Sequence, residues 1–245
     1  MKLHVIATGS KGNCYVVDDG SRQLILECGV SIKRIKQALS FNFSRVDGCL
    51  VTHSHNDHCK AVGDLCECGV NVYTSHGTAD EIGLRTYRVK RIKESLLYIA
   101  DNNVWTFKAF AVKHDTEEPF GYYVYNYALN ERFVFLTDSA YSPYTFPNLD
   151  YLFVECNHDY DSLDESCAIG DITAAHRLRV MQNHFSLENC VEFVKECKKR
   201  SDRLRKIVLL HSSDVNADVN KIIKTIQGET GIATEMATAG ATINL

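Results

Sequence analysis

The stretch Val46–His58 reads VDGCLVTHSHNDH, and it decides the fold because an apolar run delivers four potential metal ligands within six residues. His53 and His55, two positions apart in an extended chain, point the same way and can share one ion. Asp57 and His58 then turn towards a second ion at the start of a following helix. Imidazole and carboxylate groups at this density suit Zn²⁺ or a related transition metal. The stretch therefore predicts a site for two ions; the alternative is a chance cluster of polar residues on a surface loop.

The composition indicates one globular domain. The chain has 245 residues, 45% of them hydrophobic and 24% charged, with three prolines and no low-complexity tract, so we expect residues 1–245 to form a single domain. The first residues lack the apolar segment of a secretory signal, and no run approaches a membrane span in length. Ten scattered cysteines favour reduced thiols and a cytoplasmic location.

The net charge of −4 gives no general attraction to nucleic acid, but basic residues are locally dense. One basic run spans Lys195–Lys206 and a second spans Arg85–Lys93. Each is most simply explained as a solvated helix end. A surface that follows the phosphates of a nucleic acid is the alternative for each run.

Apolar runs of strand length alternate with helical patterns along the chain. Ser31 is a plausible N-cap for one helix, and Gly69 is a plausible end for the next. We expect helices at 32–39, 57–68, 187–199 and 219–226, and strands at 3–6, 15–17, 23–27, 48–51, 70–73, 104–112, 121–128, 131–136, 152–155 and 207–210. Each half has its own β-rich start, so two packed sheets covered by helices fit better than one parallel sheet.

Two ions need more donors than the His-x-His-x-Asp-His run supplies, and rigid strand ends position ligands well. Three apolar runs end in a candidate ligand: His114, Asp138 and His211. Taken alone, a strand-end histidine is usually a hydrogen-bonded core residue, and a strand-end aspartate often starts a turn. Because all three follow near-identical apolar runs downstream of one metal-binding stretch, we expect them to be ligands.

In this order, the motifs resemble those of the metallo-β-lactamase superfamily over nearly the whole chain. The resemblance implies an α/β fold, a four-layer αββα sandwich in which two mixed β-sheets are covered by helices. It also implies two divalent ions, with Zn²⁺ expected and Mn²⁺ or Fe²⁺ as alternatives. The implied ligands are His53, His55 and His114 for one ion, Asp57, His58 and His211 for the other, and Asp138 as a bridge. Glu27 stands where the superfamily usually has an aspartate that braces the metal-binding loop, so its role stays open.

Further motifs are similar to those of the WalJ/YycJ-type exonucleases within the superfamily. Asn183-His184-Phe185-Ser186 resembles that branch's Gly-His-Leu-Ser motif, with Asn183 and Phe185 departing from it. The other matching motifs are Gly9–Cys14, His114–Asp115 with Pro119–Tyr122, Thr137–Ser139, Glu155–Asp159 and Leu210–Ser212. This resemblance implies a DNA exonuclease that works in the 5′-to-3′ direction.

The expected reaction is phosphodiester hydrolysis by a hydroxide that bridges the two ions, in a site whose net positive charge favours an anionic substrate. The leaving oxygen needs a proton. By resemblance to related RNA-processing nucleases, the pair Glu155 and His184 would supply it, so the expected catalytic residues are Asp57, Glu155 and His184. Alternatively, Glu155 and His184 only form hydrogen bonds around the ligands. His158 is a rival for either role.

We expect nucleic acid, and DNA in particular, as the substrate, with no membrane partner. The Lys195–Lys206 run and the Glu155–His184 pair favour this hypothesis over a small-molecule hydrolase that cleaves a lactone, thioester or cyclic nucleotide. A metal-holding sensor without turnover is a further alternative, disfavoured because every expected ligand is present. The choice between DNA and RNA, between end-wise and internal cleavage, and the oligomeric state all stay open.

Overall fold

The computed structural model describes residues 1–211 and 217–245. These residues form two compact units. The first comprises Met1–Ala111, Thr116–Glu131 and Ala237–Leu245, and the second comprises Val112–Asp115 and Arg132–Met236. Among the described helices, none is long and apolar enough to span a membrane.

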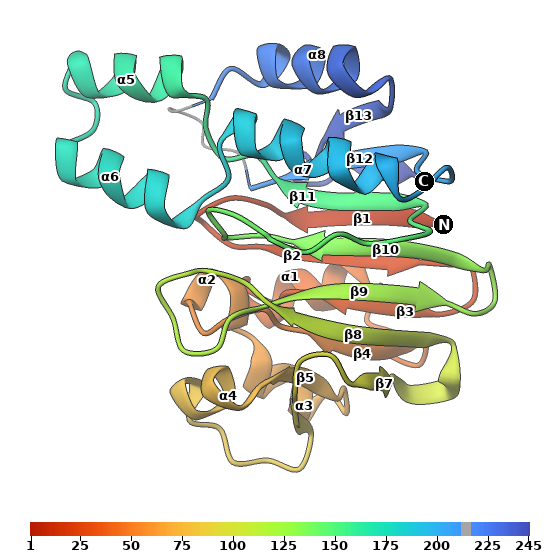
Figure 1. The fold of residues 1–245 in the computed structure, drawn as a ribbon. Helices are drawn as coiled ribbons and strands as arrows, with labels where there is room; N and C mark the ends of the chain where they lie inside the picture. The colour runs from red at the N-terminus through yellow and green to blue at the C-terminus, as the bar shows by residue number, and fades with distance from the viewer. Residues whose placement is uncertain (212–216) are drawn as a thin grey trace. The chain divides into compact units, whose positions relative to one another are not determined.

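The first unit contains a seven-stranded mixed sheet (Figure 1). Its strands lie in the order β14 (Thr242–Asn244), β1 (Lys2–Ala7), β2 (Cys14–Asp18), β3 (Gln23–Leu26), β4 (Val46–Leu50), β5 (Val72–Ser75) and β6 (Val89–Ile92). Neighbours from β14 to β3 are antiparallel, and those from β3 to β6 are parallel. Strand β4 is buried along its whole length, as expected for a central parallel strand. The same unit holds antiparallel β7 (Leu97–Ile99), β8 (Trp105–Ala111) and β9 (Phe120–Asn126).

The helices of the first unit include a correction to the predicted helix at 57–68. The chain instead forms α2 (Asn56–Cys59) and α3 (Val62–Glu67), besides α1 (Ile32–Ala38), α4 (His76–Ile82) and the 3₁₀ turn η1 (Asp101–Asn103). A continuous helix would pair the Ala61 amide with the Asp57 carbonyl. The Ala61 amide donates instead to Cys28 O at 2.9 Å, and Asp57 O accepts from the Asn13 amide at 2.7 Å. Tertiary hydrogen bonds therefore break the helix.

The second unit is built on four neighbouring parallel strands: β10 (Glu131–Leu136), β11 (Tyr151–Glu155), β12 (Lys206–Leu210) and β13 (Ala233–Met236). Its helices are α5 (Tyr160–Ala168), α6 (Ala174–Asn183), α7 (Leu187–Lys199) and α8 (Val219–Thr230). Figure 1 shows α7 and α8 on one side of these strands and α5 and α6 as a projecting pair. Because parallel strands end at one edge, the residues after β10, β11 and β12 come close together.

Most predicted elements are confirmed, including the helix at 187–199 to the residue. The strand expected at 70–73 lies two residues later, as β5. Ser31 occupies the N-cap position of α1, although its side chain makes no capping hydrogen bond. The sequence patterns missed short or edge elements, namely β6, β7, β13, β14, α4, α5 and α6.

Candidate metal centre

The first unit places four predicted ligands on the segment Thr52–His58, called the metal loop below, which leaves β4 and enters α2. His53 Nε2 and His55 Nδ1 are 3.2 Å apart. The rings of His53 and His58 have centroids 4.1 Å apart, and His58 Nε2 is 3.4 Å from Asp57 Oδ2. Three imidazoles and a carboxylate thus converge within one loop, which is the donor chemistry that Zn²⁺ and related ions prefer.

Glu27 lies behind the metal loop, at the end of β3. Its buried carboxylate accepts a hydrogen bond from the Thr52 amide at 3.2 Å, and its Oε1 is 3.7 Å from His58 Nδ1. Burial raises the pKa of Glu27, against the opposing effect of His58. The side chain therefore lies where it can orient His58, as a carboxylate does behind many metal-bound histidines.

The Gly9–Asn13 loop holds the metal loop from the other side. The Asn13 amide donates to Asp57 O, and Asn13 Nδ2 lies 3.1 Å from His58 Nε2. Gly12 and Gly29 make this approach possible: a Cβ on Gly12 would lie 2.5 Å from Gly29 O, and one on Gly29 would lie 1.6 Å from Asp57 O. The glycine-asparagine motif therefore has a packing role that sequence reasoning did not identify.

The second unit brings together Asp138, Glu155, His184 and His211, whose potential ligand atoms all lie within 4.8 Å of one another. His184 Nδ1 is 2.6 Å from Glu155 Oε1. His211 Nδ1 is 2.9 Å from the same oxygen and 2.7 Å from Asp138 Oδ1. A ring whose Nδ1 proton is held by carboxylates presents Nε2 for a metal or substrate.

In this cluster the carboxylates together raise the pKa values of the two histidines more than burial lowers them. Burial favours the neutral form of His184, but the Glu155 carboxylate raises the pKa of His184 above its ordinary value. Burial acts in the same way on His211, yet Asp138 and Glu155 raise the pKa of His211 to about 10. The pKa of Glu155 is lowered, because the two histidines overcome the effect of its burial. Glu155 therefore favours the protonated form of His184, and the histidines favour the ionised form of Glu155.

His114 joins the cluster of the second unit through the short segment Val112–Asp115. Its Nε2 is 3.2 Å from Asp115 Oδ1 and 3.8 Å from Asp138 Oδ2. Its Nδ1 is 3.3 Å from the backbone carbonyl oxygen of Asn183, which fixes the ring orientation. Since Asn183 acts through its backbone, its departure from the branch's glycine leaves this contact intact.

Three residues at strand ends near these clusters have left-handed backbone conformations. The φ angles are +61° for Glu27, +46° for Asp138 and +49° for His211. Such angles are uncommon for residues other than glycine and cost free energy that the surrounding structure must supply. Each of these three side chains contacts a histidine or a carboxylate of the two clusters.

His158 differs from the other histidines near the cluster. It is buried, and within the described part of the chain neither ring nitrogen has a hydrogen-bond partner. Burial lowers the pKa of His158 to about 4, so the ring is neutral at neutral pH and is a poor rival to His184 as a proton donor. Ser212, part of the Leu210–Ser212 motif, lies outside the described residues.

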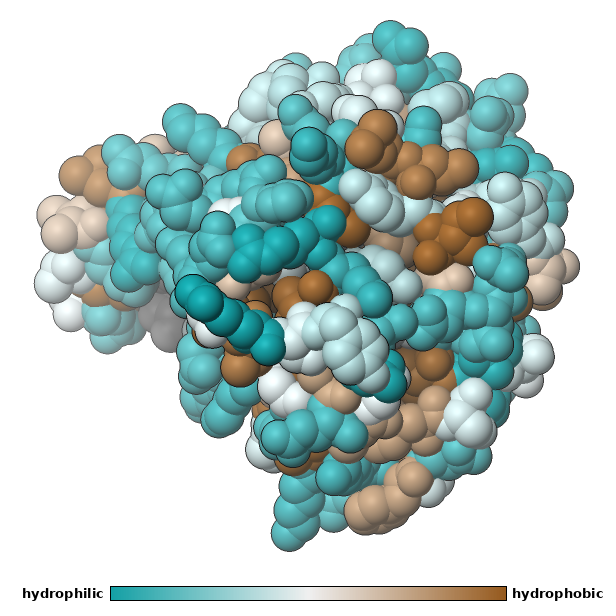
Figure 2. Space-filling view, turned by 90° about the horizontal axis from the view of Figure 1, so that it is seen from below, coloured by the Kyte–Doolittle hydropathy of each residue, from teal (hydrophilic) through white to brown (hydrophobic). Residues whose placement is uncertain are grey.

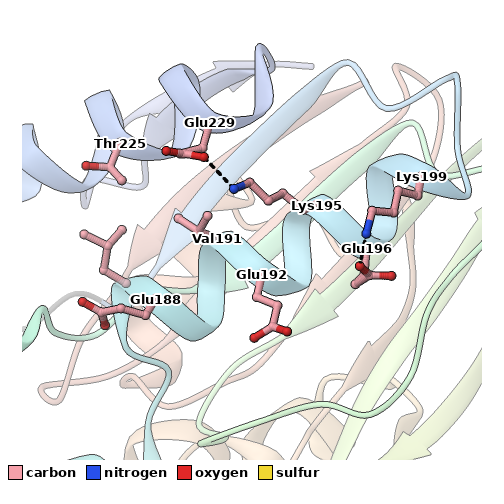
Figure 3. A pocket seen from close by; sticks show the side chains of 9 residues that line it. Glu188, Val191, Glu192, Lys195, Glu196, Lys199, Thr225 and Glu229 are labelled. Carbon is pink, nitrogen blue, oxygen red and sulfur yellow. Dashed lines mark hydrogen bonds and ion pairs between the residues drawn. The ribbon is translucent and has the colours of Figure 1, made fainter.

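The groove between α7 and α8, about 530 Å³, contains none of the predicted site residues (Figure 3). Two of its lining residues, Lys195 and Lys199, belong to the first basic run, most of which is ion-paired with neighbouring acids. Five of the seven basic residues between 195 and 206 form ion pairs: Lys195 with Glu229, Lys199 with Glu196, Arg203 and Arg205 with Asp150, and Lys206 with Glu235. This pairing weakens the argument that the run attracts phosphate groups.

Known proteins resemble the chain over most of its length. Residues 22–211 match the family model of the β-lactamase superfamily domain. An exodeoxyribonuclease WalJ of Streptococcus pneumoniae serotype 2 is 26% identical, covering 96% of this chain and 91% of the relative. An exodeoxyribonuclease YycJ of Bacillus anthracis is 27% identical, covering 77% of this chain and 84% of the relative.

Solved structures share the fold. The metallo-β-lactamase fold protein YhfI of Bacillus subtilis has a TM-score of 0.74 at 16% identity, with 98% of each chain covered. The short form of human tRNase Z has a TM-score of 0.65 at 16% identity, covering 100% of this chain and 99% of that one. The predicted resemblance and the predicted α/β sandwich, with two mixed sheets flanked by helices, are therefore confirmed.

Proposed function

Since the chain belongs to the β-lactamase superfamily domain family, we propose that it is a metal-dependent phosphodiesterase, a DNA exonuclease that degrades its substrate in the 5′-to-3′ direction. Relatives named exodeoxyribonucleases match this chain over 96% and 77% of its length. The observation that carries the proposal is the contact of 2.6 Å between Glu155 and His184 beside Asp138 and His211. Such a pair serves a reaction whose leaving group needs a proton.

We assign the metal ligands as the sequence predicted. One divalent ion would be held by His53, His55 and His114 and the other by Asp57, His58 and His211, with Asp138 as a ligand of both. The convergence of imidazole and carboxylate donors within each unit supports this assignment and fits Zn²⁺, with Mn²⁺ or Fe²⁺ as alternatives. When bound, two such ions activate a water molecule and stabilise charge on the phosphodiester. Both ligand sets draw on both units, so the proposal requires residues 1–245 to act as one domain.

The chain's own residues supply the proton and hold the ligands. Glu155 favours the protonated form of His184, whose second ring nitrogen is the donor to the departing 3′-oxygen. Glu155 also binds the amides of Ser139 and Phe185 through Oε2, at 3.3 and 3.4 Å, so the carboxylate is fixed before substrate arrives. Asp57 carries negative charge beside His58 and completes the ligand set.

The cytoplasm is the proposed location. All ten cysteines are free thiols, which is typical of a reducing compartment. Fractionation of cells that express the tagged chain tests this part of the proposal.

The proposed function is tested by direct substrate comparison. Metal-reconstituted protein is incubated with end-labelled single- and double-stranded DNA and RNA, and separately with a lactone, a thioester and a cyclic nucleotide. We expect stepwise shortening of DNA from the 5′ end, lost in Asp57→Ala, reduced at least ~100-fold in His184→Ala, and unchanged in His176→Ala, which alters an exposed histidine on α6. Intact DNA together with consumption of a small substrate would identify the alternative hydrolase.

A further inference from the structure

The second basic run forms a surface around Tyr87 that the metal centre does not use. We propose that this Tyr87 surface, composed of Leu84, Arg85, Thr86, Tyr87, Arg88 and Lys90, binds single-stranded DNA outside the metal centre. The identity of the ligand rests on the proposed function, whereas the recognition chemistry comes from the surface itself. It combines an aromatic face for a base with cations for the adjoining phosphates.

Tyr87 has the geometry of a stacking platform. Its side chain is 74% exposed, although it follows a helix in a folded part of the first unit. The Arg88 guanidinium carbon lies 4.9 Å from the ring centroid, and Lys90 Nζ lies 5.7 Å from it. Both cations lie over the ring, so a base that contacts the part of the ring left exposed would place its phosphate close to them.

A surface hollow of about 460 Å³ lies next to the ring, within the size range of sites that take small organic groups. Its wall combines apolar Leu84 and Val89 with the polar groups of Arg85, Thr86 and Arg91. Arg91 is held in place by an ion pair of 2.7 Å with Asp80. Because Asp80 also lines the hollow and pairs with Arg91, Arg85 is the cation of this wall that can meet the oxygens of one nucleotide, with apolar contact for its base.

The charge of this segment favours an anionic strand over an apolar partner. Residues 80–94 include five basic and three acidic residues, within a chain of net charge −4. In the described part of the structure, Arg85, Lys90 and Lys93 make no ion pair, in contrast to the neutralised run at 195–206. Figure 2 shows one face of the molecule, on which hydrophilic side chains predominate and hydrophobic ones form separate groups.

The surface is connected to the metal loop within the same unit. Ser54 Oγ in the metal loop donates to the Glu81 carboxylate in α4, which also accepts from the Glu117 amide at 3.3 Å. Helix α4 ends at Ile82, the residue after Glu81, and its C-cap Gly83, with a φ of +71°, turns the chain into the Tyr87 surface. Single-stranded DNA bound to the Tyr87 surface would therefore be held by a segment that directly follows α4, and α4 is hydrogen-bonded to the metal loop.

The test uses the metal-loaded protein with oligothymidylates of two lengths. Steady-state kinetics are measured on a dinucleotide and on a dodecamer, and fluorescence anisotropy measures binding of a phosphorothioate dodecamer that resists cleavage. We expect Tyr87→Ala to raise KM and Kd for the dodecamer ~10-fold, with kcat and dinucleotide turnover unchanged. Tyr87→Phe should retain wild-type values. Arg85→Gln should weaken binding and reduce the salt dependence by the equivalent of ~1 phosphate contact.

Two control variants distinguish loss of the Tyr87 surface from the general effect of removing an exposed tyrosine or a basic side chain. Tyr127→Ala removes another exposed tyrosine of the first unit, and Lys195→Ala removes a paired lysine of the first basic run; both should bind the dodecamer like wild type. If Tyr87→Ala binds the dodecamer like wild type, the proposed role of the Tyr87 surface is wrong, even if the protein cleaves DNA. Binding that depends on Tyr87 in a protein that cleaves no oligonucleotide overturns the proposed exonuclease and retains the surface.

Discussion

Replacement of Glu155 by glutamine tests the proposed proton donor most directly, because it removes one charge while conserving the shape of the side chain. In the wild type, His184 Nδ1 and Glu155 Oε1 are 2.6 Å apart, a distance typical of a charge-assisted hydrogen bond. Exchange of such a bond for a neutral one costs about 1.5 kcal/mol, equivalent to about one pKa unit. Burial lowers the pKa of His184, and in Glu155→Gln the charge of Glu155 no longer opposes this effect.

The expected consequence appears on the alkaline side of the pH–rate profile. His184 can donate a proton only while protonated, and Glu155 raises its pKa, so wild-type activity should persist above the ordinary histidine range and fall as pH rises through the raised pKa. In Glu155→Gln this fall should occur about one pH unit lower. At a pH above the pKa of His184 in both proteins, the rate of DNA cleavage should therefore decrease ~10-fold.

The assay compares two leaving groups at equal metal content. A thymidine dinucleotide releases an alkoxide that needs a proton, whereas bis(p-nitrophenyl) phosphate releases a nitrophenolate that is stable without one. Glu155→Gln and His184→Ala should slow the dinucleotide reaction and leave the nitrophenyl reaction within about threefold of wild type. His184→Ala, which has no donor at all, should show the larger loss of ~100-fold on the dinucleotide.

Equal loss on both substrates would refute the assignment of Glu155 and His184 as the leaving-group pair. Glu155 is also 2.9 Å from His211 Nδ1, so the substitution could act through a metal ligand. Metal content, measured for each variant by elemental analysis, distinguishes this case. If both rates fall with the metal fully bound, the pair supports the ligands instead, as in the alternative weighed from the sequence.

Other consequences of the geometry can be measured independently. Glu27→Gln should weaken metal binding ~10-fold, measured by chelator competition, because the carboxylate behind His58 is lost. Gly29→Ala should destabilise the fold by ~3 kcal/mol or more in denaturant titration, since its Cβ would lie 1.6 Å from a carbonyl oxygen, whereas Gly228→Ala, in an open position of α8, should stabilise it by ~0.8 kcal/mol. Because carboxylates raise the pKa of His211 to about 10, protons compete with the metal, so dialysis at pH 6 should leave less bound metal than dialysis at pH 8.

Strand ends were the most predictable part of the site. The apolar runs before His114, Asp138 and His211 were visible in the sequence. Asp138 and His211 follow β10 and β12, which belong to one set of parallel strands and so end at a common edge, whereas His114 follows antiparallel β8. The contact between Glu155 and His184 was expected from a motif resemblance, and the structure places the two side chains 2.6 Å apart. The order of the strands within each sheet depends on long-range pairing that no local pattern records.

Hydrogen bonds between distant segments explain the errors and the gaps. The break in the predicted helix 57–68 depends on Cys28 and Asn13, which lie far from it in sequence. The role of Glu27 depends on its distance to His58, and a left-handed φ at the end of β3 sets the direction of that side chain. Neither feature has a local signal, because the same residues in another fold would adopt ordinary strand and helix geometry.

The two basic runs show why charge density in a sequence is insufficient evidence for nucleic-acid binding. Both runs contain closely spaced lysine and arginine, and no feature of the sequence favours the second run over the first. In the structure, Glu229, Asp150 and Glu235 from other elements pair with the first run and remove most of its attraction for phosphate. The second run follows α4 and retains unpaired cations around an exposed ring. Binding of single-stranded DNA by this protein should therefore depend on Tyr87 and Arg85. Dodecamer binding by the variants of these two residues tests that inference.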